Sequence, residues 1–115
     1  MVAGVAMTPT RRFLDARAAG IAVRRWFTSE QGVALVLDEH VNRPGHVPGT
    51  LAKAIAKIGA QDPTNWKTAD EARLVAAYVL ARKATNMTHP MQRAERIADA
   101  VNQNTLSEDR GSFMI

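Results

Sequence analysis

The chain has 115 residues, 46% of them apolar, which suffices for one domain with a single hydrophobic core. It has no cysteine, so disulfides, thiolate metal sites and cysteine nucleophiles are excluded. Its formal net charge is +4, and the whole excess lies in residues 1–28, where five arginines accompany one acid. A positive charge concentrated in one segment indicates an anionic neighbour, such as nucleic acid, phosphate or an acidic protein surface.

The sequence carries neither a membrane span nor an export signal. No apolar run approaches the roughly 20 residues that a helix needs to cross a bilayer. The opening residues also lack the basic start and the long apolar run of a secretory signal. We therefore expect an intracellular protein that is not secreted and has no membrane partner.

The first expected element is a basic helix from Pro9 to Phe27. Thr8 can cap its free amides, and a proline costs nothing at the first helical position. Apolar residues then recur at spacings of three and four, as in a helix packed on another helix: Phe13, Ala16, Gly20, Val23 and Phe27. The arginines between them are Arg11, Arg12, Arg17, Arg24 and Arg25. The segment thus combines a broad apolar face with concentrated positive charge.

A second helix is predicted over residues 29–42. The preceding Thr28-Ser29-Glu30-Gln31 matches a capping box with Thr28 as the cap. The expected buried stripe consists of Val33, Val36, Leu37 and Val41. A buried strand over residues 33–37 is the alternative, and we reject it because no second segment of strand character could pair with it.

A loop over residues 43–49, with two prolines and two glycines, separates this helix from a shorter one. Thr50 is expected to cap the shorter helix, over residues 51–58, and Gly59 to end it. Its expected buried residues are Leu51, Ile55 and Ile58.

Two further helices are predicted in the second half of the chain. Thr68 and Glu71 delimit a second capping box, and the helix that follows over residues 69–85 should be the central packing partner of the first. A fifth helix runs from the break at residues 86–90 to about Asn102. Before these helices, Trp66 lies in a loop and is expected to fold back onto the end of the bundle.

The sequence offers no constellation for catalysis or metal binding. Its histidines, His40, His46 and His89, lack the spacing that places two ligands on one helix face. No phosphate-binding glycine loop or nucleophile motif is present. The acidic pairs Asp70/Glu71 and Glu108/Asp109 are explained by helix capping and by tail solubility. We expect a non-enzymatic protein without cofactor, metal or small-molecule substrate.

Two functional classes remain. In the first, the protein is an assembly subunit that contacts a protein partner or copies of itself; by fold-level analogy, this includes accessory or connector subunits of virus particles. The contact residues predicted for this class are the apolar tip Phe113, Met114 and Ile115, and the basic patch Arg11, Arg12, Arg17, Arg24 and Arg25. In the second, the arginines bind nucleic acid with weak sequence preference. A solvated arginine-rich face is the alternative to both.

The sequence therefore predicts an all-α fold: a compact bundle of four to five helices with ordered terminal arms. Residues 1–8 form the N-terminal arm, residues 9–102 the helical bundle and residues 103–115 a polar tail with an apolar tip. The preferred function is that of a structural or interaction subunit of a larger assembly. Deleting residues 111–115 should then abolish association and leave the helical content intact.

Overall fold

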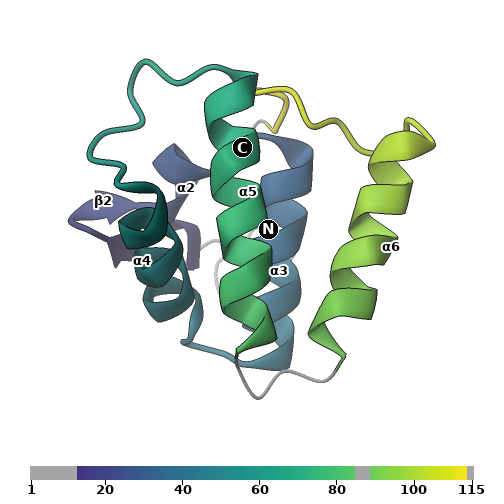
Figure 1. Ribbon diagram of the computed structural model, residues 1–115, viewed down its shortest axis with the longest axis horizontal. Coiled ribbons are helices and arrows are strands. Elements are labelled where there is room, and N and C mark those ends of the chain that lie inside the picture. Colours follow the sequence, from purple (N-terminus) through teal and green to yellow (C-terminus); the bar gives the residue numbers. More distant parts are fainter. Residues whose placement is uncertain (1–12, 85–88, 114–115) are drawn as a thin grey trace, which may run out of the picture.

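The computed structural model describes residues 13–84 and 89–113, and the predicted all-α bundle is confirmed. The main helices are α3 (Glu30–Asn42), α4 (Val47–Ile58), α5 (Thr68–Lys83) and α6 (Pro90–Asn102). Figure 1 shows α5 in the centre of the view, with α4 on one side and α6 on the other. No helix in these two ranges is long and apolar enough to cross a bilayer.

The single basic helix predicted over residues 9–27 is wrong in its described part. Residues 13–15 are helical, but the chain then forms a hairpin of β1 (Arg17–Ala18) and β2 (Ile21–Ala22), paired antiparallel. The two turn residues between them, Ala19 and Gly20, both have positive φ, at 52° and 78°. Such a turn matches the twist of a two-residue hairpin and cannot be part of a helix. Residues 9–12, and the N-terminal arm predicted over residues 1–8, lie outside the described residues.

A single helical turn, α2 (Val23–Trp26), follows the hairpin. It buries Val23 and Trp26, and the indole N–H of Trp26 donates to the carbonyl of Ala18, 3.0 Å away. The apolar residues that suggested a long helix are therefore buried by a folded-back chain. Their spacing fits both arrangements, because a tight hairpin also returns the chain to the same core.

Residues 33–37 belong to helix α3 and not to a strand, as predicted, but the residue that caps the helix differs from the prediction. The side chain of Ser29, not Thr28, accepts a hydrogen bond from the amide of Gly32. Val33 and Val36 are buried and Leu37 is half-buried, whereas Val41 is 69% exposed, so its predicted burial is wrong. Leu35 takes a place in the core instead.

Helix α4 begins at Val47, earlier than predicted, because Pro48 is accommodated in its first turn. Thr50 therefore lies inside the helix and does not cap it. Gly59 ends α4 in the left-handed conformation, with φ of 68°, as predicted. Leu51 and Ile55 are buried, and Ile58 is half-buried.

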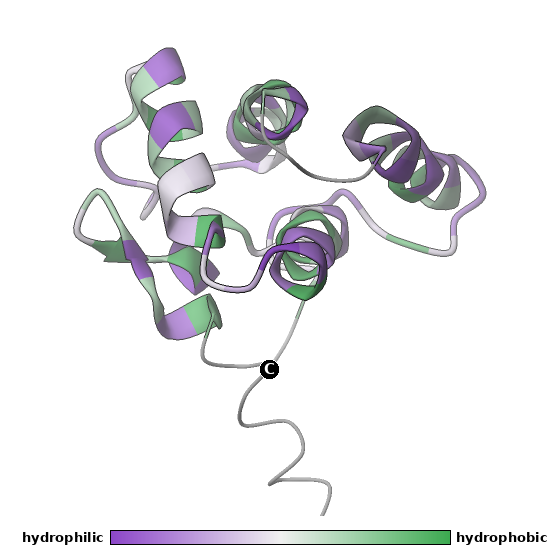
Figure 2. Cartoon of the chain, turned by 90° about the horizontal axis from the view of Figure 1, so that it is seen from below, coloured by the Kyte–Doolittle hydropathy of each residue, from purple (hydrophilic) through white to green (hydrophobic). Residues whose placement is uncertain are grey.

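Helices α5 and α6 lie close to their predicted ranges. Asp70 caps α5 one residue earlier than expected, because its carboxylate accepts from the amide of Lys67, 2.8 Å away. Helix α5 packs most extensively against α4, which corrects the expectation that the first segment would be its main partner. Viewed from below in Figure 2, the helices turn their hydrophobic sides mainly toward one another.

The core is aromatic at the end near α2. Trp26 meets Trp66 edge to face with ring centroids 5.5 Å apart, and Phe27 meets Tyr78 in the same way at 5.4 Å. Trp66 is half-buried against this cluster, so it does fold back as the sequence predicted. These rings fix the position of α2 against α5.

Candidate interaction surface

The C-terminal strap, residues 103–113, runs from the end of α6 back across the start of α3 (Figure 1). It supplies acceptors to two amides at the N-terminus of α3. The amide of Glu30 donates to the hydroxyl of Ser112, and that of Gln31 donates to the carbonyl of Ser107, each at 3.0 Å. Since the first amides of a helix have no partner within it, the strap completes the cap that Ser29 begins.

Arg110 holds the centre of the strap. Its guanidinium donates to the carboxylate of Glu71 at 2.6 Å and to three main-chain carbonyls, those of Arg25, Trp26 and Pro63. It also lies over the ring of Trp66, 5.4 Å from the centroid. One side chain thus connects the strap to α2, to the loop before α5 and to α5 itself.

Glu71 is a buried carboxylate, not the exposed capping acid that the sequence suggested. It is 1% exposed and accepts from the amides of Thr28 and Ser29, each at 3.0 Å, and from the hydroxyl of Ser29. With Arg110, these donors satisfy a charge that would otherwise be costly to bury. Spacing could not reveal this role, because Glu71 and Arg110 are 39 residues apart.

An arginine hollow of about 300 Å³ opens beside this network. Its lining residues come from α2, the segment before α3, the loop before α5 and the strap: Arg24, Arg25, Thr28, Pro63, Thr64 and Arg110. Three guanidinium groups and two hydroxyls thus gather on one surface, and no carboxylate belongs to the lining.

The structure brings together part of the predicted basic patch. Arg24 pairs with Asp15, and Arg25 donates to the hydroxyl of Thr64 at 2.7 Å and lies 3.9 Å from Asp62. Arg17 lies on the hairpin, where it donates to the carbonyl of Gly20. Arg11 and Arg12 lie outside the described residues. The continuous basic helix on which nucleic-acid binding rested is not present over residues 13–27, and such binding stays a prediction.

Asp62 remains a negative neighbour of this hollow without lining it. Hydrogen bonds from the hydroxyl and then the amide of Thr64, and the nearby charge of Arg25, hold the pKa of Asp62 below its ordinary value. The carboxylate is therefore ionised at neutral pH and offsets part of the charge of Arg25.

The predicted apolar tip is described only at Phe113. Its amide donates to the carbonyl of Thr28 at 2.8 Å, and its half-buried side chain packs against the core of its own chain. Met114 and Ile115 lie outside the described residues. Contact of this tip with a partner stays a prediction, with the difference that Phe113 already has apolar neighbours in its own chain.

An apolar groove of about 340 Å³ lies between α3 and α6. Its lining residues are Ala34, Leu37, Asp38, Val41 and Ile97. On α3 the apolar members follow a spacing of three and four, so they form one stripe along the helix. Asp38 bridges to α6 through an ion pair with Arg93, with 2.6 Å between the nitrogen and the oxygen. Asp38 also pairs with Arg82 of α5 at 2.6 Å, so the apolar groove has two ion pairs at its edge.

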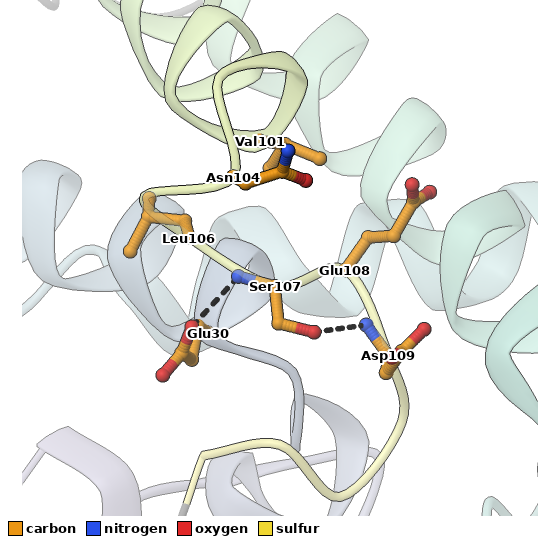
Figure 3. A pocket seen from close by; sticks show the side chains of 7 residues that line it. All are labelled: Glu30, Val101, Asn104, Leu106, Ser107, Glu108 and Asp109. Atoms are coloured by element: carbon orange, nitrogen blue, oxygen red, sulfur yellow. Dashed lines mark hydrogen bonds between the residues drawn. The ribbon is translucent and has the colours of Figure 1, made fainter.

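A second hollow, of about 310 Å³, lies where α6 passes into the strap (Figure 3). Its acids are Glu30, Glu108 and Asp109, and Figure 3 shows the carboxylates of Glu30 and Glu108 pointing in different directions. One oxygen of Glu30 already accepts from the amide of Ser107 at 2.7 Å. In residues 13–84 and 89–113, no group of three or more His, Cys, Asp and Glu side chains is placed to hold a metal ion.

A buried carboxylate also joins α3, α4 and α5. Glu39 is fully buried and accepts from the hydroxyls of Tyr78 and Thr50, the latter at 2.6 Å. Burial, and then the charge of Glu39, raise the pKa of Tyr78 far above its ordinary value. Because both carboxylate oxygens bind core hydroxyls, we interpret this network as part of the core.

The histidines lie on separate parts of the fold. His40 stacks on Phe13 with ring centroids 5.0 Å apart, His46 lies 2.7 Å from the guanidinium of Arg43, and His89 precedes α6.

Comparison with known proteins does not assign the chain to a group. No family model matches it, and neither a curated protein nor a solved structure is significantly similar to it.

Proposed function

We propose that this protein is a non-enzymatic interaction subunit of a larger assembly and that the apolar groove between α3 and α6 is its contact surface. The observation that carries the proposal is Val41, a large apolar side chain in the groove lining that is 69% exposed. Single exposed apolar residues are common on protein surfaces. Val41, however, lies in one stripe with Ala34 and Leu37, and Ile97 faces the same groove.

Helix α6 supports the same surface. Its apolar residues lie on one side of the helix, yet of these only Ala94 is buried. Its other apolar residues, Met91, Ile97, Ala98, Ala100 and Val101, are half-buried. An amphipathic helix contributes stability in proportion to the apolar area that it removes from water. A partner placed along the groove would cover more of this area.

The charges beside the groove favour a particular partner. A basic surface made by His89, Arg93 and Arg96 runs along α6 next to the groove. Arg93 already pairs with Asp38, while Arg96 is exposed. Grooves with an apolar floor accept amphipathic helices, and complementary charge orients them. We therefore propose that the partner contributes an amphipathic helix with acidic residues beside its apolar face.

Binding of a synthetic amphipathic helix tests this proposal. Two peptides with the same leucine face are compared, one flanked by glutamates and one by lysines, and their fluorescence anisotropy is measured with increasing protein. The glutamate peptide should bind more tightly. Val41→Glu should abolish the binding, and Leu80→Glu should not, because Leu80 is 51% exposed on α5 but outside the groove.

Light scattering of the protein alone tests whether a second copy of this chain, and not a partner helix, occupies the groove. A mass that doubles with concentration, and returns to the monomer mass in Val41→Glu, would replace the partner helix by a second copy of this chain. Equal binding of both peptides, or equal loss in Leu80→Glu, would contradict the groove as the contact surface.

A further inference from the structure

The arginine hollow has the chemistry of an anion site. Arginine offers five N–H donors in a planar fork that matches the oxygens of phosphate. Arg24, Arg25 and Arg110 all line this hollow, together with the hydroxyls of Thr28 and Thr64. The lining contains no carboxylate, and its two hydroxyls donate to acids outside it, Thr64 to Asp62 and Thr28 to Glu71. The groove between α3 and α6 shares no lining residue with this hollow, so the two sites are independent.

Arg110 is held in place before any ligand arrives. It donates to Glu71 and to three carbonyls, and its side chain is 15% exposed. A donor that is already fixed loses little conformational freedom when it binds. Four of its five N–H groups are thus engaged within the protein, so Arg110 gives the hollow a fixed positive group and leaves the direct contacts to phosphate mainly to Arg24 and Arg25.

Arg24 and Arg25 are the adaptable members. Their acidic partners, Asp15 and Asp62, have side chains that are 62% and 65% exposed. Ion pairs this exposed contribute little free energy. The pair of Arg25 and Asp62, at 3.9 Å, is also long for a hydrogen bond. A phosphate with two negative charges could displace these carboxylates at low cost.

We infer that the arginine hollow binds a single phosphate group with two negative charges, as carried by a small phosphorylated molecule. A volume of about 300 Å³ suits a small group. A polynucleotide would need a track of positive charge along its backbone. Arg17, the nearest further arginine in the described sequence, lies on the hairpin and not in the hollow lining.

Titration of the isotope-labelled protein with inorganic phosphate, followed by amide chemical shifts in nuclear magnetic resonance, tests the inference. Saturable shifts at millimolar phosphate should appear at Arg25, Thr28 and Thr64. Arg25→Gln should weaken binding about tenfold, because a charge-assisted hydrogen bond is lost. Arg73→Gln removes an exposed arginine on α5 outside the hollow and should leave the affinity unchanged.

A second titration, with a single-stranded oligonucleotide that lacks terminal phosphates, distinguishes a small phosphorylated ligand from a nucleic-acid backbone. It should bind no more tightly than inorganic phosphate. Tighter binding with a steep dependence on salt would overturn the inference in favour of a nucleic-acid surface. Shifts that do not saturate, or an equal loss in Arg73→Gln, would show nonspecific attraction and would also overturn it. Arg110 is left unchanged in these tests because its removal would disturb the strap.

Discussion

The guanidinium of Arg110 lies 2.6 Å from the carboxylate of Glu71 and joins the C-terminal strap to the first turn of α5. Glu71 is 1% exposed, so this is a buried ion pair at the edge of the core. A pair of this kind is often no more stabilising than apolar residues in its place, but breaking it leaves a charge buried without its partner. The strap therefore matters to the fold although it contains no helix.

Removal of this ion pair is the first prediction. Arg110→Met should lower the free energy of unfolding by about 3 kcal/mol, because Glu71 loses its cationic partner. Arg73→Met, on the exposed side of α5, should change it by less than about 0.5 kcal/mol. Urea denaturation measures both. In the double variant with Glu71→Gln, the loss should be smaller than the sum of the single losses. Strict additivity would show that the two residues are not coupled.

The two glycines within α3 and α4 should respond in opposite ways to replacement by alanine. A Cβ at Gly32 would lie 2.5 Å from Cδ1 of Phe27 and 2.7 Å from Oε2 of Glu71. Gly32→Ala should therefore destabilise the protein by about 1–3 kcal/mol. A Cβ at Gly49 meets no atom within 4 Å, so Gly49→Ala should stabilise by about 0.5–1 kcal/mol. Thermal melting checks both, and a stabilising Gly32→Ala would contradict the packing of Phe27 on α3.

Alkaline pH should destabilise the protein through Tyr78. Burial and Glu39 raise the pKa of Tyr78, so its phenol stays protonated in the folded state. The unfolded state releases this proton above about pH 10, and stability contributed by the protonated phenol is lost as the pH rises from there. Because Tyr78 is the one tyrosine of the chain, tyrosinate absorbance reports on it alone.

Tyrosinate should then appear only together with unfolding, as followed by circular dichroism. Tyr78→Phe should show a smaller loss of stability over the same alkaline range. A reversible tyrosinate signal from the folded protein near the ordinary phenol pKa would contradict the burial of this hydroxyl.

A substitution at Phe113 distinguishes two roles for its side chain, packing in the core of its own chain or contact with a partner. Since its side chain packs against the core, Phe113→Ala should lower the free energy of unfolding by about 1–2 kcal/mol, less than for a fully buried phenylalanine. Denaturation of the variant, with light scattering to follow association, measures both properties. Unchanged stability together with lost association would instead support Phe113 as an anchor for a partner.

The sequence predicted helix ends well where the end depends on a residue at that end. Pro90 at the start of α6 and Gly59 at the end of α4 affect only the adjacent helical turn, so they mark these ends in the sequence. The hairpin at residues 17–22 was missed because its apolar spacing also fits a helix. Gly20 is the one local signal that could have indicated it.

The candidate sites depended on pairs far apart in the chain. Asp62, from another part of the chain, offsets part of the charge of Arg25, and Arg110 reaches Glu71 across 39 residues. Val41 has the sequence character of a core residue but lies where no described part of the chain covers it. Hydrophobic periodicity tells which side of a helix is apolar, and only the packing of the helices decides how much of that side is removed from water.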